Sequence, residues 1–94
     1  MSTHVSTAAD AEIREMFARW FSDAAAKDID ALMTRIADDA HAFEHQVPLE
    51  HVGIDAIRTS CEQGYEGIRG EFTWDIPDLR VIVRDDIAIT WGLN

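Results

Sequence analysis

The sequence predicts an α+β domain, because helical spacing of apolar residues in its first two thirds gives way to two-residue alternation in its last third. Three segments between residues 8 and 67 carry apolar side chains at intervals of three and four residues. From residue 71 onward, apolar and polar side chains alternate. We therefore expect a single domain spanning residues 1–94, in which helices cover one face of a mostly antiparallel sheet.

Each of the three predicted helices has one apolar stripe. The first helix covers residues 8–27, and its stripe is broad and aromatic: Ile13, Met16, Phe17, Trp20, Phe21 and Ala24. The second follows Asp28, which is placed to cap its first turn, and its stripe comprises Ile29, Leu32, Met33 and Ile36. The third begins near Gly53, is broken by Gly67 and Gly70, and carries Ile54, Ile57, Cys61 and Tyr65.

The C-terminal third is expected to consist of strands. Residues 71–76 and 79–83 alternate between apolar and polar side chains. Asp85-Asp86 is expected to form a tight turn, after which residues 87–93 return antiparallel. The sequence stops directly after this last strand, so we expect either a fragment or a strand edge that is left to a partner.

Charge and composition exclude several classes of partner. Eight Lys and Arg against eighteen Asp and Glu give a formal charge of -10, which repels phosphate backbones and anionic lipid head groups. We therefore expect no nucleic acid and no membrane as a partner. The first residues resemble no signal peptide, so a cytoplasmic location is expected. A lone cysteine, Cys61, excludes an internal disulfide and a multi-cysteine metal site, and we expect no metal and no cofactor.

Three stretches of the sequence resemble a known family: AKDIDALMTRIADDAHAFEH, PLEHVGIDAIR and DLRVIVRDDIAITWGLN. The chain is similar, from about residue 10 to residue 94, to the SnoaL-like and ketosteroid-isomerase-like branch of the nuclear transport factor 2-like superfamily. Members share the acidic segment here written Ala37-Asp38-Asp39-Ala40 and a helix opened by G-x-x-A-I-R, here residues 53–58. The resemblance implies a curved sheet wrapped into a cone, with the first helices closing an apolar pocket, commonly in a homodimer. Members usually continue with two more strands.

Glu44 is the candidate general base. Residues 40–46 are expected to form a strand that ends at Val47-Pro48, with Glu44 inside it. The resemblance places Glu44 at the position of the base of ketosteroid isomerases, and apolar surroundings raise the pKa of a carboxylate toward the operating pH. The alternative is a solvated Glu44, or one that is paired with Arg58 or Arg35.

The two histidines that flank Glu44 have two interpretations. As companions of a general base, His41 and His45 would be secondary proton carriers. Together with Glu44 they also spell H-x-x-E-H, which is a zinc-protease signature when it lies on a helix. On a strand the histidines would lie about 13 Å apart, at about 3.3 Å per residue, which is too far to share one ion. The family resemblance favours the strand.

Five aromatic residues are expected to shape the pocket: Phe17, Trp20, Tyr65, Trp74 and Trp91. The resemblance places Trp20 where the isomerases have an oxyanion-stabilising tyrosine. An indole N–H donates one hydrogen bond but cannot give up a proton, so its polarising effect on a carbonyl would be weak. Core packing explains Tyr65, Trp74 and Trp91 equally well.

Two functions remain open at this point. The first is binding of a small apolar molecule, with carboxylate-based isomerisation, cyclisation or dehydration at Glu44. The second is a non-catalytic ligand-binding or dimerisation module of the same fold. The two differ in whether Glu44 faces an enclosed cavity or water. In either case residues 87–93 present large apolar side chains beside an unprotected edge, which predicts a homodimer joined through its sheet.

Overall fold

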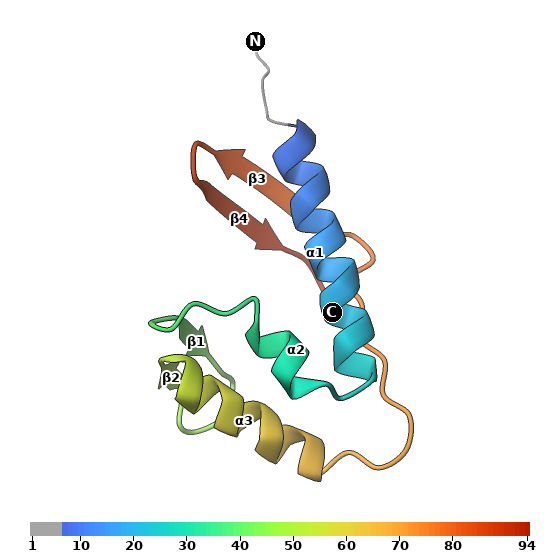
Figure 1. The fold of residues 1–94 in the computed structure, drawn as a ribbon, viewed down its shortest axis with the longest axis vertical. Coiled ribbons are helices and arrows are strands. Elements are labelled where there is room, and N and C mark those ends of the chain that lie inside the picture. Colours follow the sequence, from blue (N-terminus) through green and yellow to red (C-terminus); the bar gives the residue numbers. More distant parts are fainter. Residues whose placement is uncertain (1–6) are drawn as a thin grey trace. The chain divides into compact units, whose positions relative to one another are not determined.

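The computed structural model describes residues 7–94, which form two compact units. The first unit consists of the opening helix up to Ser22 together with residues 73–94, and the second consists of residues 23–72. The elements, in chain order, are α1 (Thr7–Ala25), α2 (Ile29–Met33), β1 (His41–Phe43), β2 (Glu50–Val52), α3 (Ile54–Glu66), β3 (Arg80–Arg84) and β4 (Ile87–Trp91) (Figure 1). This order confirms the predicted α+β class.

In the first unit, the β3–β4 hairpin runs beside the first half of α1 (Figure 1). The strands pair antiparallel around the predicted Asp85-Asp86 turn, and Ile82 lies opposite Ile89. Asp85 has φ 53, which matches the positive φ that a two-residue hairpin turn requires at this position. Arg14 on α1 ties the helix to the base of the hairpin, because its Nη1 donates to the carbonyl of Leu79 at 2.9 Å.

In the second unit, α2 begins as predicted and ends early. The side chain of Asp28 accepts a hydrogen bond from the backbone N–H of Ala31 at 3.1 Å, which caps the first turn. After Met33, successive backbone N–H groups bond to carbonyls three residues back, so the expected helical turn through Ile36 is a tighter 3₁₀-like turn.

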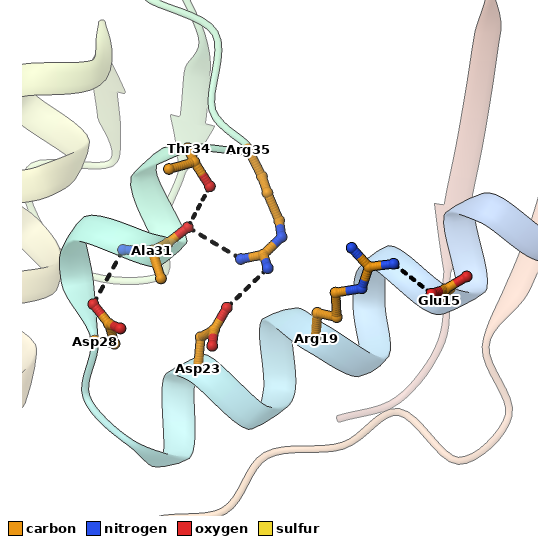
Figure 2. A network of polar contacts seen from close by, with 7 residues as sticks. All are labelled: Glu15, Arg19, Asp23, Asp28, Ala31, Thr34 and Arg35. Carbon is orange, nitrogen blue, oxygen red and sulfur yellow. Dashed lines mark hydrogen bonds and ion pairs between the residues drawn. The ribbon is translucent and has the colours of Figure 1, made fainter.

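A polar network fixes this tighter turn to the end of α1 (Figure 2). The guanidinium of Arg35 forms an ion pair with Asp23 at 2.8 Å and also donates to the carbonyl of Ala31 at 3.1 Å. The hydroxyl of Thr34 donates to the same carbonyl at 2.6 Å. The Ala31 carbonyl therefore accepts two side-chain hydrogen bonds at the point where α2 stops.

The core of the second unit lies among its three helical segments. Ala24, Leu32, Met33 and Ile57 are buried there. The helices α2 and α3 lie side by side around this core (Figure 1). Arg58 on α3 forms an exposed ion pair with Asp30 on α2 at 2.7 Å. The predicted limits of α3 are confirmed, because Gly53 precedes its first residue and Gly67 follows its last.

The strands differ most from their prediction. The segment 40–46 is a strand only over β1, which pairs antiparallel with β2, a strand that the sequence did not predict. Residues 71–76 form no regular strand, although their side chains alternate between half-buried and exposed as expected. The sheet consists of two separate two-stranded hairpins, β1–β2 and β3–β4. The alternation predicted which side chains are covered, but a strand also needs a hydrogen-bonding neighbour.

Candidate functional site

An aromatic cluster lies in the first unit, between α1 and the segment that precedes β3. Trp74 contacts Trp20 with ring centroids 6.1 Å apart in an edge-to-face arrangement, and it contacts Phe21 at 5.7 Å. Phe21 contacts Phe17 at 6.0 Å. All four rings are half-buried. We call these four residues, Phe17, Trp20, Phe21 and Trp74, the aromatic cluster.

The cluster forms because three of its members share one face of α1. Phe17, Trp20 and Phe21 are three and four residues apart, the spacing that brings helical side chains together. Trp74 reaches them from a segment without regular structure, and this segment continues into residues 76–79, which pack against Gly92. A Cβ on Gly92 would overlap Cγ2 of Ile76 and lie 3.2 Å from the carbonyl oxygen of Asp78. The absence of a side chain at Gly92 therefore permits this close packing.

Glu44 lies directly after β1, in the second unit, and its side chain is exposed. Its backbone N–H donates to the carbonyl of Leu49 at 2.8 Å, which extends the hairpin pairing by one residue. Both arginines considered as its partners bind other carboxylates, because Arg58 pairs with Asp30 and Arg35 with Asp23. The alternative prediction, in which Glu44 forms an ion pair with one of these arginines, is therefore wrong.

The carboxylate of Glu44 acts electrostatically on α3. Burial raises the pKa of the Cys61 thiol, and the charges of Glu44 and Glu62 raise it further. Cys61 is half-buried on α3, and a raised pKa leaves its thiol protonated and weakly nucleophilic at neutral pH. This agrees with the place of Cys61 in the apolar stripe of the third predicted helix.

His41 lies in β1 and is held by a residue that the sequence did not single out. Its Nδ1 lies 2.8 Å from Oε2 of Glu50, which stands on the neighbouring strand β2. Both side chains are exposed. Glu50 could not be foreseen as its partner, because β2 is three residues long and shows no alternation of its own. His45 lies in the bend after β1 and is exposed.

The extended conformation of β1 also decides the zinc hypothesis. Because residues 41–43 are a strand and Glu44 is not helical, the two histidines do not share a helix face, so the H-x-x-E-H interpretation is wrong. Among residues 7–94, no group of three His, Cys, Asp or Glu side chains is arranged to hold a metal ion.

The two remaining aromatic candidates lie outside the aromatic cluster. Tyr65, on α3, donates its hydroxyl hydrogen to the carbonyl of Ala24 at 2.8 Å, and its ring meets Phe72 edge to face at 5.8 Å. Burial raises the pKa of Tyr65, and the Cys61 charge adds to this effect. Trp91 ends β4 and is 48% exposed. The structure therefore brings Phe17, Trp20 and Trp74 together, and it adds Phe21 to them.

Comparison with known proteins agrees with this architecture. The model of the SnoaL-like domain matches residues 13–93, which is most of the chain. The chain belongs to the SnoaL-like domain family. In this SnoaL-like chain a hydrogen bond connects the acidic segment to the G-x-x-A-I-R segment. The backbone N–H of Ile54 donates to the carbonyl of Asp38 at 3.0 Å.

The fold of this SnoaL-like protein is also that of a solved structure. It is similar to an NTF2-like protein of unknown function from Pseudomonas putida KT2440, with a TM-score of 0.86 and 29% sequence identity. The match covers 93% of this chain and 61% of that protein, so the chain spans less than two thirds of the other's length. No curated protein matches the sequence. Within residues 7–94, no helix is long and apolar enough to cross a bilayer.

Proposed function

We propose that the protein binds a small apolar molecule, and that the aromatic cluster holds it. The observation that carries this proposal is the set of ring contacts at 5.7–6.1 Å between Trp74, Trp20, Phe21 and Phe17. The four rings are half-buried, so each keeps exposed surface against which a planar or aliphatic molecule can pack. Membership of the SnoaL-like family supports ligand binding of this general kind.

The proposal is tested by titrating the ¹⁵N-labelled protein with tetralin, an apolar bicyclic hydrocarbon, and following backbone and indole resonances. We expect the indole resonances of Trp20 and Trp74 to move, and Phe17→Leu to weaken binding severalfold. Phe43→Leu is the matched control, because Phe43 is 76% exposed on β1 and belongs to the second unit. Equal weakening by both substitutions, or no binding by the wild type, would contradict the proposal.

Catalysis by a carboxylate base is the second proposed function. Glu44 would remove a proton in an isomerisation, cyclisation or dehydration, with His41 or His45 as secondary proton carriers. The contact between His41 and Glu50 supports this role, because a carboxylate at Nδ1 fixes the imidazole tautomer and leaves Nε2 free. The exposure of Glu44 favours simple binding over catalysis. With an authentic substrate, Glu44→Gln should abolish turnover and leave ligand affinity unchanged.

We further propose that the protein is a homodimer joined through β4. Ile87 and Ile89 are 63% and 59% exposed, and Trp91 lies on the same face of the strand. The register places Ile82 opposite Ile89 on this face and Arg80 and Arg84 opposite Trp91 and Ile87, so the apolar surface extends onto β3 only at Ile82. The outer edge of β4 has no strand beside it among the described residues. Pairing with a second copy would cover both the face and the edge.

A further inference from the structure

The β1–β2 hairpin has two different faces. In each strand the middle residue is half-buried and its two neighbours are exposed. These middle residues, Ala42 and His51, lie directly opposite each other in the antiparallel register, so they share the inner face. The contact between His41 and Glu50 belongs to the outer face, because each of them is next to a middle residue. Of the two strand histidines, His51 is therefore the one on the inner face.

Glu44 continues the inner face beyond the end of β1. Its backbone N–H bonds to the carbonyl of Leu49, which keeps the pairing in register, and Glu44 follows Ala42 by two residues. Its charge also raises the pKa of the Cys61 thiol on α3, which agrees with this direction. The helix α3 packs against β2, the strand that carries His51 (Figure 1). Glu44 and His51 therefore lie on the side of the hairpin that faces α3.

The spacing of Glu44 and His51 suits two groups that act on one substrate. Diagonal neighbours on one face of an antiparallel pair lie about 7–8 Å apart, which leaves room for part of a small molecule between their side chains. No ion pair within residues 7–94 engages Glu44. Glu44 is exposed and His51 is half-buried, so a solute reaches the carboxylate while the imidazole is partly shielded from water. A base and a hydrogen-bond donor are thus available on one face.

We propose that His51 is a further catalytic residue of the reaction proposed for Glu44, and that its imidazole N–H donates to the substrate oxygen on which negative charge develops. The inference rests on the proposed carboxylate-base function. Glu44 removes a proton from carbon, the C–H electron pair moves toward the oxygen-bearing group, and His51 stabilises the oxygen that receives the charge. The outward position of His41 favours His51 over it for this role. The sequence pattern did not single out His51, because its place opposite Ala42 follows from the pairing of β1 with β2.

The test uses two probes for a carboxylate base, 1,2-benzisoxazole and its 5-nitro derivative, whose ring opening needs no other reagent. The base removes the proton at C3, the C–H electron pair forms a nitrile, and the N–O bond breaks to leave a phenolate oxygen. The nitro group stabilises this phenolate, so the nitro derivative depends less on a hydrogen-bond donor.

His51→Leu removes the donor and should slow the opening of the unsubstituted probe about fivefold to tenfold, the worth of one hydrogen bond. The nitro derivative should be slowed much less. Val52→Leu is the matched control, because it places the same side chain at the neighbouring position on the outer face, and it should leave both rates unchanged.

A second measurement compares the two faces without catalysis and leaves His51 in place. At a fixed pH of about 7, Glu44→Gln should shift the imidazole resonances of His51 and leave those of His41 in place. Glu50→Gln should do the reverse, because each carboxylate shares a face with one histidine.

The outcomes separate the inference from the proposed function. If Glu44→Gln abolishes ring opening but His51→Leu slows both probes equally or neither, the inference is overturned and the carboxylate base stands. The inference is also overturned if Glu44→Gln leaves the His51 resonances in place. If the wild type opens neither probe faster than Glu44→Gln does, both the carboxylate-base function and the inference fail.

Discussion

Gly53 donates its backbone N–H to the carbonyl of Ala40 at 2.7 Å. This hydrogen bond joins the last residue of the acidic segment to the residue that opens α3, and β1 and β2 pair directly beside it. Gly53 has φ 89 and ψ 157, a backbone conformation that is essentially restricted to glycine. The chain therefore needs a glycine at this position in order to leave β2 and enter α3 within one residue.

Gly53→Ala should destabilise the protein by about 1–3 kcal/mol, the cost of this backbone conformation for a residue with a Cβ. The matched control is Gly64→Ala, inside α3, where an added Cβ meets nothing within 4 Å. That substitution should stabilise the protein by about 0.5–1 kcal/mol, because alanine loses less backbone entropy on folding. Urea unfolding of both variants measures the two effects. Similar changes of the same sign would contradict the assigned role of Gly53.

The helices could be predicted from the sequence because their signals are local. The limits of α3 follow from Gly53 and Gly67, and the start of α2 follows from Asp28. The β3–β4 hairpin was equally accessible, since the Asp85-Asp86 turn fixes its register. The strand β2 could not be predicted, because three residues are too few to show an alternation of apolar and polar side chains. Its pairing with β1 also depends on a connection of six residues.

The candidate site was predictable only in part, for the same reason. Phe17 and Trp20 share a helix face, so periodicity brings them together. Trp74 follows Phe21 by 53 residues in the sequence, and no local pattern predicts the contact between their rings. The contact between His41 and Glu50 was likewise not predictable, because the register of the β1–β2 hairpin alone brings the two side chains together. Glu44 was expected inside a strand but lies directly after β1, because the strand stops at Phe43.

Tyr65→Phe should cost about 0.5–1.5 kcal/mol, because it removes the hydrogen bond from the Tyr65 hydroxyl to the carbonyl of Ala24. The effect should disappear in alkali. Burial raises the pKa of Tyr65, so the folded state holds the phenolic proton more tightly than the unfolded chain does. This contribution is complete below the unfolded pKa of about 10 and is lost as pH rises through the folded pKa. Denaturation of both proteins between pH 7 and pH 11 measures it, and a constant difference would contradict the assignment.

Glu44→Gln should lower the pKa of the Cys61 thiol, because it removes a negative charge that opposes thiolate formation. The pKa should stay above the ordinary value, since burial is the larger cause. The pH dependence of the reaction of Cys61 with a disulfide reagent gives this pKa directly, because only the thiolate reacts. Glu62→Gln should act in the same direction. Glu71→Gln is the matched control, as the Glu71 charge is not among the causes of the shift; an equal effect there would show that Glu44 has no special proximity to Cys61.

Ile89→Lys should convert the proposed homodimer into a monomer. Ile89 lies in the middle of β4, and a lysine there would place a charge in the apolar face formed with Ile82 and Trp91. Light scattering at about 100 µM should give a mass of twice 10.6 kDa for the wild type and the mass of one chain for the variant.

Val52→Lys is the matched control, because Val52 is 58% exposed on the separate β1–β2 hairpin, close to the 59% of Ile89. Burial of apolar area yields about 25 cal/mol per Å², so a face of several large side chains in water favours association. A monomeric wild type, or dissociation by Val52→Lys as well, would show that β4 does not form the interface.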